Sequence, residues 1–311
     1  MKYKSLRGMN DLVGDQAKKY SLVESKIISL VNSYGFDEVR TPLAEVTELF
    51  ERSIGSSTDI VNKELYSFED RNNKSISIRP EGTAGVVRAL IENDLDRHGI
   101  DVWYLGPMYR YERPQKGRNR EFYQLSAEAY GFDGVNIDSE MIYMSYKIFS
   151  FLDLKDYYLE INSLGSKETQ QNFSKAIKDY LIPIKDQLDP DSQARLNSNT
   201  LRILDSKNPE TQKILKNGPK IFEFLSQKSI EDFDLLRSNL DEMKIPYKVN
   251  NNLVRGLDYY NDVVYEWKSK ALGSQNTFCA GGRYDSLSKN LGGSAIPAAG
   301  ISNGLDRLII S

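Results

Sequence analysis

Residues 110–131 read RYERPQKGRNREFYQLSAEAYG, and this stretch predicts a pair of strands joined by a basic loop. The run that leads into it, VWYLGPMYRYE, is rich in the aromatic and β-branched residues that suit a strand. We expect that strand to end in the triplet at 110–112. Pro114 and Gly117 then interrupt the pattern, as is typical of a loop. The chain returns as a second strand over residues 122–128.

The loop carries more positive than negative charge. Its two carboxylates are Glu112 and Glu121. Its basic residues are Arg110, Arg113, Lys116, Arg118 and Arg120. A forked guanidinium matches a pair of phosphate oxygens better than an ammonium does. Charge runs alone more often mark an ordinary solvated hairpin tip, so the rest of the chain must decide between the two interpretations.

Five stretches, in order along the chain, resemble the class II aminoacyl-tRNA synthetases, and specifically the histidyl-tRNA synthetase family. They are RPEGTAG (79–85), RYERPQKGRNREFYQ (110–124), LVRGLDYY (253–260), AGGRYD (280–285) and GISNGLDR (300–307). The resemblance extends from Arg7 to the last residue. It implies formation of histidyl-adenylate from L-histidine and ATP, followed by transfer to the 3′ end of tRNA(His).

Composition is compatible with this resemblance. The chain has 311 residues, 40% hydrophobic and 27% charged, with a net charge of −3. An acidic whole does not favour nonspecific nucleic-acid binding, so RNA contacts need a local basic patch. Cys279 is the single cysteine, which excludes an intrachain disulfide. No signal-peptide or membrane-length apolar run occurs, and we expect a cytoplasmic protein without membrane contact.

His98 is the only histidine in the sequence. A single histidine excludes metal sites that need two, and it excludes the paired-histidine signature of class I synthetases. We expect His98 to lie on the surface without a role.

The first part of the chain predicts a helix at 18–34, where apolar residues recur at steps of three and four. A short strand at 36–42 follows. Helix and strand together resemble motif 1 of class II synthetases, which implies a homodimer interface; the alternative is a simple packed helix. Strands at 65–69 and 75–79 form a hairpin, and Thr83 is expected to cap the next helix.

The remaining pattern divides the chain into three parts. Residues 1–165 and 246–311 form the two parts of a class II catalytic domain, and residues 166–245 form a helical insertion between them. Strands and helices do not alternate regularly. We therefore predict an α+β fold with a mixed, mainly antiparallel sheet flanked by helices. A strand at 277–280 is expected to lead through two glycines into a helix near 284–291. The family normally continues into an anticodon-binding domain, which we expect to be absent from these 311 residues.

The resemblance assigns ATP contacts to four residues. Arg110 would hold the α-phosphate and Arg307 the γ-phosphate, while Glu112 and Phe122 would lie at the adenine. A Mg²⁺ ion should bridge phosphate oxygens. Arg255 resembles a substitute for the metal that other class II enzymes use at the α-phosphate, which makes Arg255 and Arg110 the catalytic candidates. The alternative for Arg255 is a salt bridge with Asp258.

Recognition of histidine requires partners for an imidazole ring. A carboxylate can accept a ring N–H and a tyrosine hydroxyl can serve the other nitrogen. By resemblance, the histidine-binding residues are Glu81, Gly82, Thr83, Gln124, Glu128, Arg255, Tyr259, Tyr260 and Tyr284. The alternatives without a role in histidine binding are a solvated turn position for Glu81 and a strand position facing water for Glu128.

The basic loop supplies candidates for the acceptor end of tRNA, namely Gln115, Lys116, Arg118 and Arg120. Another function shares the fold: the non-catalytic, histidine-sensing regulatory subunit of ATP phosphoribosyltransferase. The complete set of Arg110, Arg255 and Arg307 argues against a sensor, which needs no ATP apparatus. A synthetase-like module of a regulatory kinase is a third possibility, but no kinase sequence is present.

Overall fold

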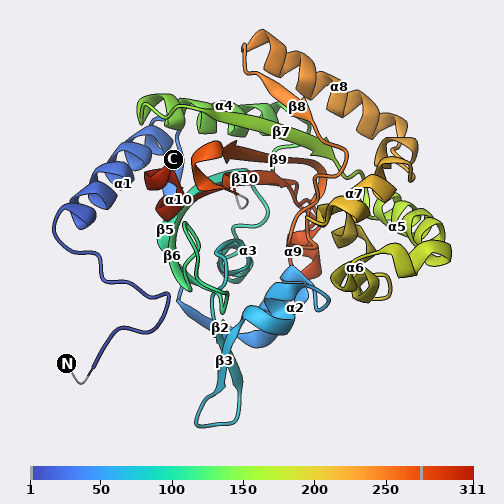
Figure 1. Cartoon of the computed structure of the whole chain (residues 1–311). Helices are drawn as coiled ribbons and strands as arrows, with labels where there is room; N and C mark the ends of the chain where they lie inside the picture. Colours follow the sequence, from blue (N-terminus) through green and yellow to red (C-terminus); the bar gives the residue numbers. More distant parts are fainter. Residues whose placement is uncertain (1–2, 274–275) are drawn as a thin grey trace.

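The computed structural model describes residues 3–273 and 276–311, and its centre is an eight-stranded sheet (Figure 1). The strand order is β1-β5-β6-β11-β10-β9-β7-β8. Only the outermost pairs, β1 with β5 and β7 with β8, are parallel. In order across the sheet the strands are Asp37–Glu38, Ile100–Tyr109, Glu121–Tyr130, Ala298–Gly304, Thr277–Arg283, Asn261–Ser269, Tyr157–Ser163 and Tyr247–Val249. The predicted α+β class with a mixed, mainly antiparallel sheet is confirmed.

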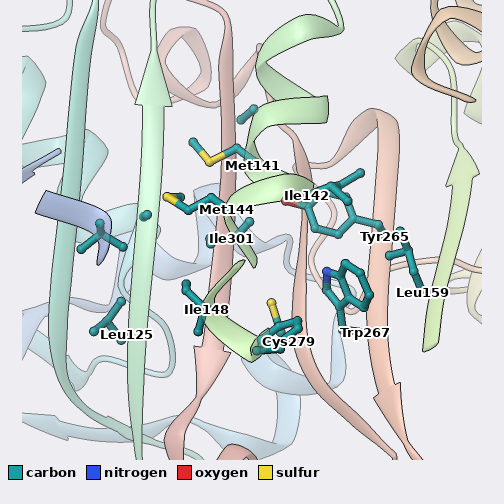
Figure 2. Packing of buried hydrophobic residues seen from close by; sticks show 14 of the residues in the cluster. Leu125, Met141, Ile142, Met144, Ile148, Leu159, Tyr265, Trp267, Cys279 and Ile301 are labelled. Carbon is teal, nitrogen blue, oxygen red and sulfur yellow. The ribbon is translucent and has the colours of Figure 1, made fainter. Parts of the chain in front are cut away.

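One face of the sheet carries the larger hydrophobic core. The helices over it are α1 (Asp15–Ser33), α4 (Asn136–Phe151), α8 (Gln227–Glu242) and α10 (Leu305–Ile310). Alternation along each strand decides which side chains enter this core. Tyr265 and Trp267 of β9 lie in this core, and Figure 2 shows Ile301 of β11 and Leu125 of β6 further across the same face.

The other face positions the candidate site. Helix α3 (Thr83–Glu92) covers its middle, and the helices α5 (Lys167–Leu181), α6 (Pro190–Arg195) and α7 (Pro209–Lys216) cover the end beyond β9 (Figure 1). Residues 166–245, all of which the structure describes, contain helices and no strand. A small sheet of order β2-β4-β3 borders this face with helix α2 (Thr47–Ile54). Its strands are Ala44–Val46, Ser75–Ile78 and Tyr66–Glu69.

Two local expectations were wrong. Strand β5 ends at Tyr109, before the Arg110-Tyr111-Glu112 triplet. Arg110 N still donates across to Arg120 O at 2.9 Å. The ladder stops there because Arg120 N donates to Gly8 O at 2.7 Å and Tyr111 N donates to Glu64 O at 2.7 Å.

The second wrong expectation is the extent of the helix near 284–291, which forms but is shorter. Strand β10 runs through both glycines to Arg283, and helix α9 spans only Leu287–Asn290. A Cβ on Gly281 would lie 2.3 Å from Gly300 O, so the two bare glycines let β10 stay paired with β11. Tyr284 is therefore held by the sheet, with its N–H donating to Ala298 O at 2.8 Å.

Other elements match the expectations within a few residues. The first helix and the hairpin of β3 and β4 form where predicted, and the short strand expected at 36–42 is reduced to Asp37–Glu38. His98 is exposed, as expected. None of the helices in the described part of the chain is long and apolar enough to cross a membrane.

Candidate active site

Two adjoining cavities lie over the middle strands of the sheet, on the face that carries α3. The inner one has a volume of about 60 Å³ and the outer one about 260 Å³. Arg110, Gln124, Arg255 and Ser302 line both. Together the cavities form one cleft with a narrow inner end.

Strand β6 shows how the sequence builds the cleft. Leu125 and Ala127 alternate into the large core, whereas Phe122, Gln124 and Glu128 lie on the opposite face and line the cleft. One strand thus contributes side chains to both cavities.

Glu128 is the central group of the inner cavity and is only 1% exposed. Its carboxylate accepts hydrogen bonds from Thr83 Oγ1 at 2.5 Å, from the Tyr104 hydroxyl at 3.2 Å and from the Tyr130 hydroxyl. Burial raises the pKa of Glu128 to about 7, against these donors, which lower it. The prediction that Glu128 does not face water is confirmed.

Three tyrosine rings, those of Tyr259, Tyr260 and Tyr284, also line the inner cavity. Tyr259 and Tyr260 have ring centroids 4.7 Å apart, and Tyr284 lies 5.5 Å from the first and 6.0 Å from the second. The Tyr284 hydroxyl is buried and has no hydrogen-bond partner among the described residues. A buried polar atom without a partner is a natural contact for a ligand.

The prediction that the Thr83 side chain caps helix α3 was wrong. Thr83 is the first residue of α3 and its side chain does not cap the helix. The carboxylate of Glu81 does so instead, accepting from Thr83 N at 2.8 Å and Ala84 N at 2.9 Å. This pairing lets Glu81 be 4% exposed, so the solvated alternative was wrong. A sequence pattern could not show the turn that brings Glu81 back to the helix start.

Gly82 does not line either cavity. A Cβ at this position would lie 2.1 Å from the Tyr104 ring. The glycine therefore permits Tyr104 to reach Glu128. Apart from Gly82, all residues predicted to bind histidine line the inner cavity.

The outer cavity contains the four residues predicted to bind ATP, namely Arg110, Glu112, Phe122 and Arg307. Arg110 Nε donates to Pro80 O at 2.9 Å, and its guanidinium lies 5.3 Å from the Phe122 ring centroid. Arg307 donates to Gly117 O at 2.7 Å and to Thr277 O at 2.5 Å. Burial, with Arg118 close by, lowers the pKa of Arg307. Two fixed guanidinium groups in one cavity form an environment that suits an anion.

Arg255 lies where the two cavities meet. Its Nη1 donates to Glu266 Oε1 at 2.5 Å. Asp258, the alternative partner, instead accepts hydrogen bonds from Ser57 and Asn199, each at 3.3 Å. The Arg255 Nε is buried without a hydrogen-bond partner among the described residues. The arginine is thus held by the Glu266 carboxylate, with its guanidinium carbon 5.3 Å from the Tyr260 ring centroid, and within the described part of the chain its Nε stays free.

The basic loop reaches the cleft unevenly. Arg118 lines the outer cavity and pairs with Glu112, while Gln115 forms an isolated bridge with Arg118. Lys116 Nζ donates to Ala271 O at 3.0 Å. The Arg120 guanidinium lies 3.8 Å from the Tyr111 ring centroid, outside both cavities.

Sequence reasoning missed several polar residues of the cleft, among them Tyr104, Glu266 and Thr277, and also Tyr130, which donates to Glu128 from behind the cavity wall. For Glu266 a signal existed, because it alternates with the core residues Tyr265 and Trp267 in a strand. A charged residue on the non-core face of a central strand needs a partner.

A mainly antiparallel sheet that presents Arg110, Arg255 and Arg307 to one cleft defines a class II aminoacyl-tRNA synthetase catalytic fold. Residues 8–308 match the family model of histidyl-tRNA synthetase, and the chain belongs to that family.

Relatives of this chain support the same family. It is 49% identical over 308 residues to the histidine–tRNA ligase of Francisella philomiragia, and 50% identical to that of Francisella tularensis subsp. holarctica. Each match covers 98% of this chain and 73% of the relative. The crystal structure of apo histidyl-tRNA synthetase from S. aureus superimposes with a TM-score of 0.79 at 32% identity, covering 99% of this chain and 73% of that one.

A second solved structure shares the fold at 20% identity and a TM-score of 0.73. It covers 99% of this chain and 83% of that one. It is the crystal structure of an ATP phosphoribosyltransferase regulatory subunit/histidyl-tRNA synthetase from Bacillus halodurans. At this identity the likeness concerns the fold alone.

Proposed function

We propose that this chain is a histidine–tRNA ligase, which activates L-histidine with ATP and transfers it to the 3′ end of tRNA(His). The observation that carries the proposal is the shape of the cleft. A buried carboxylate, Glu128, closes its inner end, and five arginines, Arg110, Arg255 and Arg307 among them, line the adjoining outer cavity. A small polar ring and a polyphosphate are the ligands that suit these two environments.

Histidine would bind with its side chain in the inner cavity. The Glu128 carboxylate accepts one imidazole N–H, and the Tyr260 or Tyr284 hydroxyl serves the other ring nitrogen. Glu81 and Thr83 hold the α-amino group, while Gln124 and Arg255 face the carboxylate. An amino acid without a ring N–H leaves these buried groups unpaired, which is the basis for rejecting it.

ATP would bind in the outer cavity, with its adenine stacked on Phe122 beside Glu112 and its γ-phosphate at Arg307. A histidine carboxylate oxygen attacks the α-phosphorus in line, the new oxygen–phosphorus bond forms, and pyrophosphate leaves. Negative charge develops on the α-phosphate oxygens. Arg110 and Arg255 stabilise this charge because both guanidinium groups are already fixed in place.

Mg²⁺ enters the proposal as the companion of ATP. The described residues contain no group of three histidine, cysteine or acidic side chains that could hold a metal ion. The carboxylates that line the outer cavity, Glu112, Asp205, Glu266 and Asp306, already accept hydrogen bonds or pair with cations. The ion would therefore be held mainly by phosphate oxygens and water.

Transfer to tRNA would follow in the same cleft. The 3′-terminal ribose hydroxyl attacks the acyl carbon and releases AMP. Gln115, Lys116, Arg118 and Arg120 are proposed to contact the acceptor end. We assign residues 1–165 and 246–311 to the catalytic domain and 166–245 to a helical insertion beside the acceptor arm.

Helix α1 and strand β1, which resemble motif 1, are proposed to lie in a homodimer interface. Cytoplasmic location is part of the proposal, since the substrates ATP and tRNA are found there.

The first experiment is histidine-dependent exchange of labelled pyrophosphate into ATP. We expect exchange with L-histidine and none with glutamine or phenylalanine at the same concentration. A regulatory subunit would bind histidine in a calorimetric titration yet catalyse no exchange. That result would replace the proposed ligase activity with histidine sensing.

A further inference from the structure

Two acidic residues lie directly opposite each other on neighbouring strands beside the cleft. Glu160 of β7 is the register partner of Glu266 of β9. Like charges directly opposite in a sheet are destabilising. The two side chains are only 15% and 14% exposed, so water screens them poorly. This arrangement needs a cation.

Lys268 supplies that cation from two positions further along β9, on the same face of the sheet. Its Nζ lies 2.7 Å from Glu160 Oε2 and 3.2 Å from Glu266 Oε2, and its side chain is 13% exposed. The ammonium is thus shared by the two opposed carboxylates.

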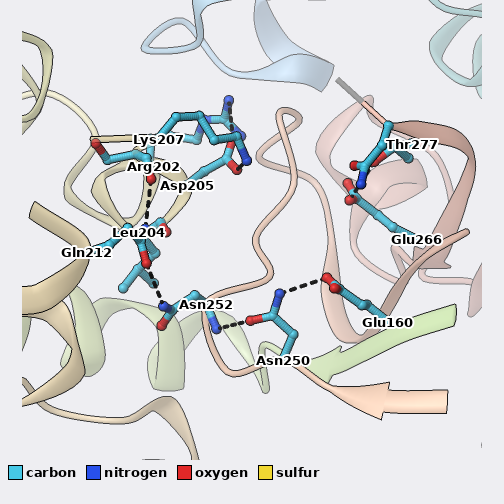
Figure 3. A network of polar contacts seen from close by, with 12 residues as sticks. Glu160, Arg202, Leu204, Asp205, Lys207, Gln212, Asn250, Asn252, Glu266 and Thr277 are labelled. Carbon is cyan, nitrogen blue, oxygen red and sulfur yellow. Dashed lines mark hydrogen bonds and ion pairs between the residues drawn. The ribbon is translucent and has the colours of Figure 1, made fainter. Parts of the chain in front are cut away.

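Glu266 connects this pair to the cleft. Its Oε1 accepts from Arg255 at 2.5 Å. Its Oε2 accepts from Thr277 Oγ1 at 2.8 Å, and Figure 3 shows these two side chains. Burial would raise the pKa of Glu266, but Arg255 and Lys268 bring it below its ordinary value. Glu266 is therefore an ionised acceptor with three donors around it.

The far end of the chain of contacts is anchored as well. Asn250 Nδ2 donates to Glu160 Oε2 at 2.8 Å, and Asn252 N donates to Asn250 Oδ1 at 3.0 Å (Figure 3). Asn252 also contacts Gln212 of α7 at 3.4 Å. Glu160 is held from the loop before β9 and is not free to turn away from Lys268.

We propose that Lys268 is a positioning residue for histidine activation: it holds Glu266 in place between the strands, and Glu266 fixes the direction of Arg255. The inference rests on the role proposed above for Arg255. Lys268 touches no substrate; it acts through Glu266. Because the free Nε of Arg255 then points in one direction, the effect falls on the charge that develops during reaction and less on the binding of either substrate.

The test compares Lys268→Met with Lys268→Arg. Methionine keeps much of the volume and removes the charge, while arginine keeps a cation that can reach both carboxylates. Displacement of a catalytic group by about 1 Å can cost on the order of 100-fold in rate, so we expect Lys268→Met to lower kcat of pyrophosphate exchange about 10- to 100-fold. KM for ATP and histidine should change less than threefold, and Lys268→Arg should recover most of the rate.

A matched control is Lys213→Met, which removes a lysine from an exposed ion pair with Glu210. It should leave kcat unchanged. If Lys268→Met unfolds the protein, the double variant Lys268→Met/Glu160→Gln removes the opposed charge as well and restores a testable sheet. It should fold and still show the loss of kcat.

A double-mutant cycle with Arg255→Ala separates this inference from the proposed function. If Lys268 acts through Arg255, Lys268→Met should have no further effect in the Arg255→Ala background. Full activity of Arg255→Ala would overturn the role of Arg255 itself. A slow Arg255→Ala with an unaffected Lys268→Met, or equal losses from Lys268→Met in both backgrounds, would overturn only the positioning role.

Discussion

The inner and outer cavities of the cleft differ in the charged groups that they present to a ligand. In the inner cavity the Glu128 carboxylate is surrounded by neutral hydroxyl donors, and among the described residues no cation pairs with it. In the outer cavity Arg110 and Arg307 are held by backbone carbonyls, and Arg255 by a carboxylate. The inner cavity thus offers an acceptor of adjustable charge, while the outer one offers permanent cations. The difference suits discrimination of a ligand in the first and stabilisation of developing charge in the second.

The largest expected effect comes from removing a cation where the cavities meet. Arg255→Ala should lower the rate of adenylate formation about 100- to 1000-fold, the usual cost of one preorganised electrostatic donor. ATP affinity should fall much less, and added Mg²⁺ should not restore the rate. Single-turnover formation of histidyl-adenylate, with ATP binding measured separately, tests this. Near-normal rates would remove Arg255 from the mechanism.

The variant Glu128→Gln tests whether the inner cavity binds histidine through this carboxylate. The amide keeps the shape but loses the charge-assisted acceptor, which contributes about 1.5–3 kcal/mol when buried. Histidine affinity should fall roughly 10- to 100-fold, as that energy implies, and ATP affinity should stay within a few-fold. Calorimetric titration with each ligand separately measures both. Equal weakening of the two ligands would mean that Glu128 only supports the fold.

The basic loop carries Lys116, which lines neither cavity and is proposed to contact tRNA. Lys116 is exposed and contacts only a backbone carbonyl in the described structure, so Lys116→Ala should leave pyrophosphate exchange intact. If the loop contacts tRNA phosphates, the variant should raise KM for tRNA(His) several-fold and reduce its dependence on salt by about one counterion. Aminoacylation at two salt concentrations measures this, with Lys213→Ala as the control. An unchanged salt dependence would exclude Lys116 from the tRNA contact.

The smallest expected effect concerns pH and stability without ligands. The pKa of Glu128 rises from 4.5 to about 7 on folding because of burial. Its contribution to stability is therefore fully present below pH 4.5 and is lost as pH rises through about 7. Glutamine cannot ionise, so Glu128→Gln should stabilise the protein relative to wild type by a few degrees more at pH 8 than at pH 5. Thermal denaturation at the two pH values checks the sign. An equal difference at both would show that Glu128 does not titrate in this range.

Much of the cleft could be predicted from residues close together in sequence. Alternation in β6 places Phe122, Gln124 and Glu128 on one face, and the motif at 253–260 places Arg255 beside the tyrosines. Such patterns can be predicted from the sequence because backbone geometry fixes the period at which side chains alternate along a strand.

Contacts between distant residues could not be predicted in this way. Thr83 and Glu128 are 45 positions apart, and Arg307 and Gly117 are 190 apart. The sequence by itself determined the fold class, the order of most elements and many of the polar side chains of the cleft, including Glu128, Arg255 and Arg307. Only the tertiary structure decided that Glu81 caps α3, that Arg255 pairs with Glu266 and not Asp258, and that Lys268 lies between two opposed carboxylates. Those partnerships depend on strand register and on the path of the turns, because a buried charge takes whichever donors the packed sheet brings within reach.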